Sequence, residues 1–461
     1  MTLTPDVFYT QSLKEHACGD QISRILAACL SAVEPGTLVK RALKVERNQL
    51  ITSQLSLDLQ EYERVFLVAI GKASFPMAVS ACEILSNKIT QGFVLSKTNV
   101  EIPYDWKGLN ITYLLGGHPV PTQDSLDSTN LIVNTLTGLS NKDLVLILLS
   151  GGGSSLFSSP APGISLSDLQ NTTQALLRSG ATINEINTLR KHISTVKGGK
   201  LAKIASPARV VTLILSDVMG DSLDMIASGL TAPDPSTYLD ALNVIKKYQL
   251  EDLLPNSVTK HLFRARENSS PENPKPGDAF FDNVNNIIIG NNNTAIKAGI
   301  KQAEMEGFKI DKEVDQLEGE ASLVGSDLAK ILLKRIKRYP PDSKPVCTIT
   351  GGETTVTIPS TIQSGKGGRN LETALSALIN LDGAEDAILI TLASDGEDGT
   401  TGAAGGVVTG RSYRRAVKLN LDPDQELKDH NSYMIFDNLN DLIKTGPTKT
   451  NVNDLCFIFS F

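Results

Sequence analysis

Runs of apolar residues recur along the chain, and most of them are continuous rather than alternating with polar positions. Continuous runs are typical of strands buried on both faces of a parallel sheet. Helix-like stretches lie between the runs, so the pattern predicts a three-layer α/β architecture. The runs predicted as strands are residues 65–71, 144–150, 210–217, 286–290, 346–352 and 387–396, and the predicted helices include 74–85, 293–308 and 322–339.

The chain of 461 residues exceeds the size of one ordinary hydrophobic core, so we expect two domains. Residues 267–280 contain three prolines among polar residues and are the best linker candidate by composition. We therefore predict an N-terminal α/β domain over residues 1–265 and a C-terminal α/β domain over residues 280–461.

The formal net charge is −7, from 44 Lys and Arg against 51 Asp and Glu. An acidic chain is a poor match for nucleic acid or an anionic membrane surface, although a local basic pocket stays compatible with it. The five scattered cysteines form no CxxC pair, the N-terminus is polar, and no apolar run reaches 18 residues. These features predict a cytoplasmic protein with reduced thiols and no membrane span.

Most of the predicted strands end in Gly, or in Ser or Asp followed by turn residues. Ligands of open α/β sheets collect beyond the carboxyl ends of the strands, so these loops are expected to line a crevice. The clearest loop follows an aliphatic strand and consists of Ser150, Gly151, Gly152, Gly153, Ser154 and Ser155.

Three known uses of a glycine-rich loop do not fit this stretch. A Rossmann fingerprint and a nucleophile elbow both need a glycine at Leu156, and the lysines that follow a glycine, Lys72 and Lys200, lack the Ser or Thr of a Walker P-loop. Two interpretations remain. The loop is a nest of main-chain N–H groups that binds an anion such as phosphate, or it is a tight turn that packs a strand against a helix.

Charged residues near strand and helix ends support the phosphate interpretation. Lys72 follows the first predicted strand, and Arg369 comes after two glycines and before a helix, where its planar donors suit phosphate or carboxylate. Asp217 and Asp395 end buried strands, where an aspartate holds Mg²⁺, accepts a hydroxyl proton or caps a helix. The basic run 190–202 either receives a small carboxylate or forms a solvated helix face.

Nine segments in fixed order make the chain similar to the class II glycerate kinases, the glycerate 2-kinase family whose C-terminal half is called the MOFRL domain. Each segment alone is unspecific, whereas the ordered set covers most of the chain and is highly specific. The segments are GGHPVPTQDS, SGGGSSL, RKHISTVKGGKLA, SDVMGDSLDMIASGLTAPDPST, GNNNTA, TGGETTVT, GKGGRNLE, ASDGEDG and GPTKTNVND.

The resemblance implies ATP- and Mg²⁺-dependent phosphorylation of D-glycerate at the 2-hydroxyl, giving 2-phosphoglycerate and ADP. It implies a Rossmann-like N-terminal domain with a mostly parallel sheet and an active site in the interdomain cleft. Lys72, Asp217 and Arg369 lie where the family's proposed catalytic residues lie. The other candidates are Ser150, Gly151, Gly152, Gly153, Ser154, Ser155, Asn292 and Glu353 for nucleotide or phosphate, His118, Arg190 and Lys197 for substrate, and Asp217 and Asp395 for metal. A homodimer is a further hypothesis.

Two other functions stay open. An NAD(P)H-dependent hydroxypyruvate reductase would act on a substrate that differs from glycerate only in oxidation state, but the failed dinucleotide fingerprint argues against it. A non-catalytic sugar-acid or nucleotide-binding protein would not need Lys72, Asp217, Arg369 and Asp395 together. An assay of NADH oxidation with hydroxypyruvate tests the first alternative.

Overall fold

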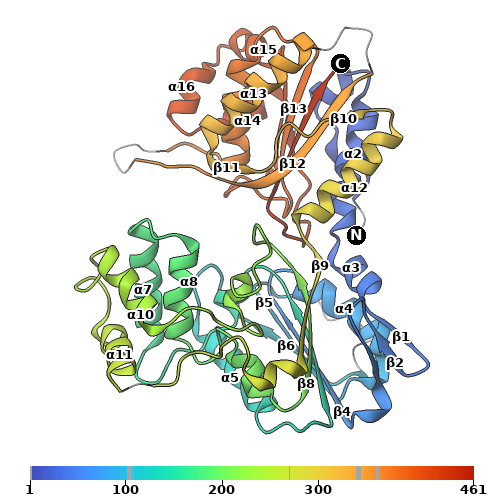
Figure 1. The fold of residues 1–461 in the computed structure, drawn as a ribbon. Helices are drawn as coiled ribbons and strands as arrows, with labels where there is room; N and C mark the ends of the chain where they lie inside the picture. Colours follow the sequence, from blue (N-terminus) through green and yellow to red (C-terminus); the bar gives the residue numbers. More distant parts are fainter. Residues whose placement is uncertain (1–2, 101–105, 107, 269, 339–343, 360–363) are drawn as a thin grey trace. The chain divides into compact units, whose positions relative to one another are not determined.

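The computed structural model describes residues 3–100, 106, 108–268, 270–338, 344–359 and 364–461. The chain forms two compact α/β units (Figure 1). We call Pro35–Ile289 the parallel-sheet unit, and Met1–Glu34 together with Gly290–Phe461 the mixed-sheet unit. This division differs from the predicted domains 1–265 and 280–461 in two ways. The boundary lies between residues 289 and 290, and the first 34 residues belong to the same unit as the C-terminal part of the chain.

The segment that composition marked as a linker is packed inside the parallel-sheet unit. Asn273 Nδ2 donates to the buried carboxylate of Asp234 at 2.7 Å, and Glu272 accepts from the main-chain N–H of Tyr238. Prolines and polar residues here serve a packed loop that is rich in hydrogen bonds. Composition cannot separate such a loop from a linker, because both avoid regular secondary structure.

Six strands form the main sheet of the parallel-sheet unit, in the order β6-β5-β4-β7-β8-β9. The pairings from β6 through to β8 are all parallel, as predicted. The order is that of a doubly wound Rossmann sheet. In such a sheet the strands are added first toward one edge and then toward the other, and the change occurs between the first and fourth strands, here β4 and β7. The strands are β4 (Arg64–Ile70), β5 (Gln91–Ser96), β6 (Ile111–Leu115), β7 (Asp143–Leu149), β8 (Arg209–Leu215) and β9 (Val284–Gly290).

The strands of this sheet are apolar on both faces, so helices cover it. Every residue of β7 is buried, and Phe66, Val68 and Ile70 of β4 join a core that includes residues of α5 and α9. Helix α4 packs against β4, β5 and β7. The helices are α3 (Pro35–Ala42), α4 (Ser74–Leu85), α5 (Gln123–Leu136), α6 (Gly153–Leu156) and α9 (Lys200–Ala205).

Four further helices of the parallel-sheet unit share a core of their own (green to yellow-green in Figure 1). Three of them begin with a capping box, in which the hydroxyl of Ser165, Thr182 or Thr237 is paired with an acidic residue three positions on. They are α7 (Leu166–Arg178), α8 (Ile183–His192), α10 (Tyr238–Lys247) and α11 (Asn256–Glu267). A small antiparallel sheet contains β1 (Lys44–Glu46), β2 (Gln49–Ile51) and β3 (Ser56–Asp58).

The sheet of the mixed-sheet unit has the order β10-β12-β16-β13-β14-β15, with β11 also paired to β12. The last strand, β16, lies between β12 and β13 and is antiparallel to both. The continuous apolar runs of β12 and β13 therefore do not mark an all-parallel sheet. Both strands pair antiparallel with β16, although β12 also pairs parallel with β10 and β11. Helices on both faces give parallel and antiparallel strands the same apolar pattern. The strands are β10 (Lys309–Ile310), β11 (Leu317–Glu320), β12 (Val346–Thr355), β13 (Ala387–Ala393), β14 (Gly405–Thr409), β15 (Leu442–Ile443) and β16 (Asp454–Ser460).

Helices α2 and α12 cover one face of this sheet, and α13 and α14 cover the other (Figure 1). The apolar side of α2, with Ile22, Ile25 and Cys29, packs so closely on α12 that a methyl group at Gly299 would lie 2.3 Å from Cys29 Sγ. This packing places the N-terminal segment in the mixed-sheet unit. The helices are α1 (Gln11–Glu15), α2 (Gly19–Ala32), α12 (Asn292–Met305), α13 (Ala321–Arg338), α14 (Arg369–Asn380), α15 (Ser412–Lys418), α16 (Pro423–Lys428) and α17 (Ser432–Leu439).

Within the described residues, no single helix combines the length and the apolar character needed to cross a membrane. One bent pair, α2 with α3, meets that requirement on length and composition alone.

Candidate active site

The loops after β4 and β7 meet where the strand order of the parallel-sheet unit reverses. Ser150 N donates to Ile70 O at 3.0 Å, and Lys72 N donates to Gly151 O at 2.8 Å. Ala73 N donates to the hydroxyl of Ser150 at 3.0 Å. Ligands of doubly wound sheets bind at this reversal point. Two of the loops singled out in the sequence therefore form one candidate site.

The glycine-rich loop is crowded and offers unpaired donors. Gly71 has a φ of +124°, and a methyl group there would lie 2.3 Å from Ser150 Oγ. Gly152 has a φ of +83° in the left-handed region. In the part of the chain that the structure describes, the main-chain N–H groups of residues 151–154 donate to no protein acceptor. Consecutive N–H groups around a left-handed residue form an anion nest, which supports the phosphate interpretation over the simple turn.

Three predicted side chains lie against this loop. A methyl group at Gly152 would lie 2.9 Å from His118 Cδ2 and 3.2 Å from Lys72 Cγ. One at Gly151 would lie 2.0 Å from Asp217 Oδ2. Burial, and then the nearby charge of Lys72, lowers the pKa of His118 to about 4. His118 is therefore a neutral hydrogen-bonding group near pH 7, and Lys72 is the cation of this cluster.

Lys197 is buried and Arg190 is half-buried, and neither cation has a carboxylate partner among the described residues. Lys197 Nζ is buried and donates to Phe157 O at 2.7 Å, directly after α6 of the glycine-rich loop. Burial, and then the charges of Arg190 and Lys200, lowers the pKa of Lys197 to about 7. Burial also lowers the pKa of Arg190. An anion bound between these groups would remove the cost of burying them.

The other cations of the basic run 190–202 hold the fold together. Lys191 Nζ is buried between Asp224 and Asp234, at 3.0 and 2.9 Å. Lys200 Nζ donates to the main-chain oxygens of Lys191 and Ser194 at 2.8 and 2.6 Å. The run is therefore neither a solvated face nor one receptor for a carboxylate. Only some of its cations are left for a ligand.

Arg369 begins α14 in the mixed-sheet unit, and two carboxylates hold its guanidinium. Nη1 donates to Glu353 Oε1 at 2.5 Å, and Nε lies 2.6 Å from Asp454 Oδ2. Glu353 and Asp454 come from the paired strands β12 and β16. The sequence predicted Arg369 and Glu353 as site residues, and the structure brings them into contact. Asp454, the second carboxylate on Arg369, was not among the predicted residues.

The N-terminus of α14 already has an anion of its own. Asp398 accepts hydrogen bonds from the main-chain N–H groups of Asn370 and Leu371 at 3.0 and 2.8 Å. The ability of this region to attract a phosphate therefore depends on the guanidinium of Arg369 and not on free helix donors. A cavity of about 490 Å³ borders Arg369 and is lined by Val356, Ile358, Ser364, Gly365, Lys366, Gly367, Gly368, Glu372, Glu397, Asp398, Gly399, Thr400 and His430.

Asn292 and Asp395 also belong to the mixed-sheet unit. The amide of Asn292 donates to the main-chain oxygens of Val452 and Asp454 at 2.7 and 3.0 Å. Asp395 accepts from the main-chain N–H of Glu397 at 3.2 Å, as a turn residue does. The first contact fixes the chain next to the partner of Arg369. The phosphate role of Asn292 and the metal role of Asp395 stay predictions.

No group of three or more His, Cys, Asp and Glu side chains among the described residues could hold a metal ion. Mg²⁺ in phosphoryl-transfer sites is held by one or two carboxylates, water and the substrate phosphates. Asp217 beside the anion nest fits that pattern, because a nucleotide would supply most of the oxygen ligands.

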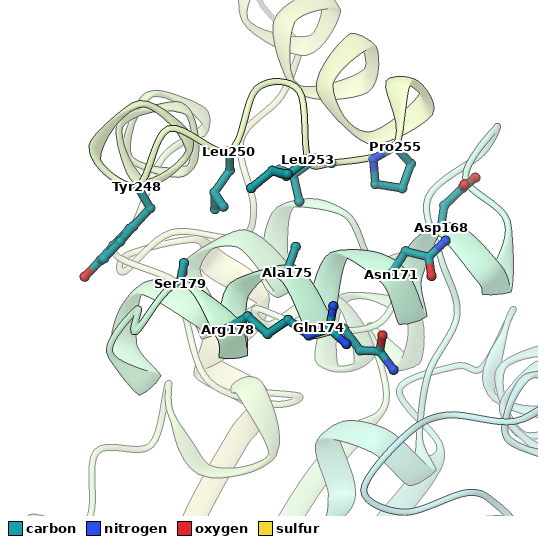
Figure 2. A pocket seen from close by; sticks show the side chains of 11 residues that line it. Asp168, Asn171, Gln174, Ala175, Arg178, Ser179, Tyr248, Leu250, Leu253 and Pro255 are labelled. Carbon is teal, nitrogen blue, oxygen red and sulfur yellow. The ribbon is translucent and has the colours of Figure 1, made fainter. Parts of the chain in front are cut away.

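A cavity of about 600 Å³ in the parallel-sheet unit lies apart from the predicted residues (Figure 2). Leu250, Leu253 and Pro255 project from the chain before α11 toward α7, which contributes Ala175 and Asn171. None of the predicted site residues lines this cavity. Its other lining residues are Asp168, Gln174, Arg178, Ser179, Tyr248 and Leu254.

A doubly wound sheet with an anion nest at its reversal point, and the buried cation Lys197 next to the helix that follows the nest, defines the class of protein. It is an α/β protein that handles phosphate or small acids. Two family models match the chain, the domain of unknown function DUF4147 over residues 21–263 and the MOFRL family over residues 346–454. Among curated relatives, the glycerate 2-kinase of Pyrococcus horikoshii is 38% identical over 94% of this chain and 95% of its own length. The D-glycerate 2-kinase of Thermotoga maritima is 41% identical over 97% and 99%.

The crystal structure of the Thermotoga maritima glycerate kinase superimposes with a TM-score of 0.81 and 40% identity over 96% of this chain and 99% of that chain. The chain therefore belongs to the glycerate 2-kinase family. A relative from Agrobacterium vitis, 38% identical over 85% of this chain and 86% of its own length, is named putative hydroxypyruvate reductase.

Proposed function

We propose that this protein transfers the γ-phosphoryl group of ATP to the 2-hydroxyl of D-glycerate. The observation that carries the proposal is the buried ammonium of Lys197, which donates to Phe157 O directly after the glycine-rich loop and feels the charge of Arg190. Neither cation has a carboxylate partner among the described residues. A substrate carboxylate would form charge-assisted hydrogen bonds with both groups. The full-length similarity to proteins named glycerate 2-kinases supports the same substrate.

Each remaining residue either positions a reactant or neutralises charge. Phosphoryl transfer needs these two contributions from the protein more than covalent chemistry. The N–H groups of residues 151–154 bind phosphate oxygens. Lys72 and Arg369 neutralise the transferring group, and His118, as a neutral ring, hydrogen-bonds the substrate. Asn292 and Glu353 take part through the main chain of Asp454 and the guanidinium of Arg369.

The loop serines Ser150 and Ser155 support this site from within. Ser150 Oγ accepts from Ala73 N, and Ser155 Oγ donates to Pro119 O at 2.6 Å, next to His118. These bonds hold the loops after β4 and β7 and the segment around His118 together.

Mg²⁺ accompanies ATP in this proposal and supplies neutralisation of the phosphate charge. Asp217 and Asp395 are its proposed protein ligands. Alternatively, one of the two binds Mg²⁺ and the other accepts the proton of the substrate hydroxyl. Replacing either residue with asparagine keeps the size and removes the charge. We expect both D217N and D395N to lower turnover most strongly at limiting Mg²⁺, with partial recovery at excess Mg²⁺. Turnover near that of the unmodified enzyme in both variants at limiting Mg²⁺ would exclude both roles.

The proposed reaction is tested by incubating the protein with D-glycerate, ATP and Mg²⁺ and assigning the product by ³¹P NMR. We expect 2-phosphoglycerate, and a kcat/KM for D-glycerate at least about tenfold above that for glycerol, because glycerol has no carboxylate for Arg190 and Lys197. Comparable values for the two substrates would contradict the carboxylate site. A 3-phosphoglycerate product would contradict the assigned hydroxyl.

A reductase is the second candidate, because one relative is named as such. The loop after β7 lacks the third glycine of a dinucleotide fingerprint, which favours the kinase. NADH oxidation with hydroxypyruvate at a rate above that of glycerate phosphorylation would reverse this order. We further propose a cytoplasmic homodimer, which cell fractionation and sedimentation of the purified protein would test.

A further inference from the structure

Three side chains form a hydrogen-bonded series that ends at the glycine-rich loop. Ser228 Oγ donates to Asn187 Oδ1 at 2.9 Å, and Ser154 Oγ lies 2.7 Å from Ser228 Oγ. Asn187 and Ser228 are buried, whereas Ser154 is half-buried. Asn187 lies on α8 about one turn before Arg190. The series therefore connects the loop to the region of the proposed carboxylate site.

The series has one direction. A serine hydroxyl has one proton to donate and two lone pairs to accept with. Ser228 gives its proton to the oxygen of Asn187, whose nitrogen faces Met225 Sδ at 3.9 Å. Ser228 can then only accept from Ser154. The proton of Ser154 is committed, and its oxygen offers lone pairs alone to a ligand.

The backbone holds Ser228 in an unusual conformation to make this arrangement. Ala227 and Ser228 have φ values of 49° and 58°, in the left-handed region that residues with a Cβ avoid. Ser228 O accepts from Gly198 N at 3.0 Å, immediately after the buried Lys197. A methyl group at Gly153 would lie 2.8 Å from Ala227 Cβ. The turn is therefore fixed between the loop and Lys197, the cation proposed to bind the substrate carboxylate.

We propose that Ser154 Oγ accepts a hydrogen bond from the non-reacting 3-hydroxyl of the acceptor, and that Ser228 and Asn187 are positioning residues for it. The inference rests on the proposed function. It assigns the Ser154 side chain to the substrate, while its main-chain N–H stays with the phosphate nest. An oxygen with only lone pairs repels phosphate or carboxylate oxygens and attracts an O–H donor.

This arrangement selects acids that carry a second hydroxyl. A 2-hydroxy acid without the 3-hydroxyl, such as lactate, would leave Ser154 Oγ facing a methyl group with no donor. Sites built to hydrogen-bond a hydroxyl reject the analogue that lacks it, because the polar group of the protein is then unpaired.

The test is the ratio of kcat/KM for D-glycerate to that for D-lactate. We expect S154A to lower this ratio by at least about tenfold, because the alanine methyl group no longer needs a donor. We expect S228A to lower it less, because Ser154 keeps its oxygen but its proton is free to turn toward the ligand. S158A is the matched control, since Ser158 Oγ donates to the main-chain oxygen of Ser154 at 2.9 Å and not to the series. Its ratio should stay unchanged.

The direction of the series is tested with 3-fluorolactate, whose fluorine can accept but not donate. The unmodified enzyme should use it no better than D-lactate, and clearly better use would show that Ser154 donates and overturn the inference. An unchanged ratio in S154A, or an equal fall in S158A, would also overturn it. Absence of glycerate phosphorylation in the unmodified enzyme would instead refute the proposed function.

Discussion

Replacing Arg369 with lysine is expected to lower kcat for D-glycerate by at least about tenfold, roughly 1.4 kcal/mol of barrier, while the apparent KM for ATP changes less. The guanidinium contacts Glu353 through Nη1 and Asp454 through Nε, at 2.5 and 2.6 Å. A lysine keeps the charge but loses the planar fork, so it cannot hold both carboxylates and still donate to a phosphoryl oxygen.

Lys72→Ala should act in the same sense, because it removes the cation next to Gly152 outright. Protein cations that face the transferring phosphoryl group stabilise the negative charge that shifts in the transition state. Removal of such a cation therefore lowers kcat more than it weakens ATP binding. Initial-rate kinetics with ATP and D-glycerate varied separately give the two parameters.

A matched control for Arg369→Lys is Arg415→Lys in the same unit. Arg415 also has a forked contact, with Nη1 at 2.8 Å from both Ser12 Oγ and Asp441 Oδ2, but it belongs to no predicted site. R415K should lower the unfolding temperature and leave kcat per folded molecule unchanged. A large rise in KM with kcat untouched in R369K or K72A would mean that these residues only hold ligand.

The strands could be predicted well from the sequence, whereas their direction could be predicted only in part. Continuous apolar runs locate β4, β7, β8, β9, β12 and β13 to within a few residues. The same runs cannot reveal that β16 enters between β12 and β13 and makes that sheet mixed, because burial on both faces gives one pattern for either direction. The amphipathic pattern of α2 also does not show which element its apolar side packs against. The prediction therefore missed that residues 1–34 belong to the mixed-sheet unit.

The grouping of residues in the candidate site could be predicted where a strand end supplies the residue. Lys72, Asp217 and the loop 150–155 follow strands directly, and the doubly wound order brings them together. Asp454 and Ser228 lie in segments that carry the family resemblance. The sequence of those segments does not indicate which residues the two side chains contact. Asn187 carried no signal, because a polar residue on a helix is ordinarily solvent-exposed and only its burial makes it notable.

The basic run 190–202 shows the limit most clearly. The sequence alone does not show which of the basic residues Arg190, Lys191 and Lys197 is paired. In the structure, Lys191 contacts two aspartates, whereas Lys197 donates to a main-chain oxygen only. That difference depends on which carboxylates distant segments deliver, which spacing along the chain does not contain.

Lys197→Met is therefore expected to separate binding from stability. We expect the KM for D-glycerate to rise at least about 30-fold, on the order of 2 kcal/mol, because the substrate carboxylate loses a buried charged partner. The folded protein without substrate should not be destabilised at pH 6. Loss of the bond to Phe157 O costs about 1–3 kcal/mol, whereas burying the unpaired ammonium costs several kcal/mol, and methionine removes that cost.

The pH dependence of the K197M effect follows from the pKa of Lys197, which burial and the neighbouring cations lower from 10.5 to about 7. Below pH 7 both folded and unfolded chains carry the proton, and the folded chain bears the whole cost of the buried charge. Between pH 7 and 10.5 only the unfolded chain is protonated, so the folded wild type gains stability as the pH rises. The advantage of K197M in unfolding temperature should thus be largest below pH 7 and shrink toward pH 10.

Lys191→Met is the control with the opposite sign. It leaves Asp224 and Asp234 without the ammonium that lies 3.0 and 2.9 Å from them, so it should destabilise the fold by about 3–5 kcal/mol. Thermal unfolding and glycerate kinetics on the two variants give the decisive comparison. If K197M is as unstable as K191M, or if its KM for D-glycerate is unchanged, then Lys197 is a structural residue and the substrate carboxylate is bound elsewhere.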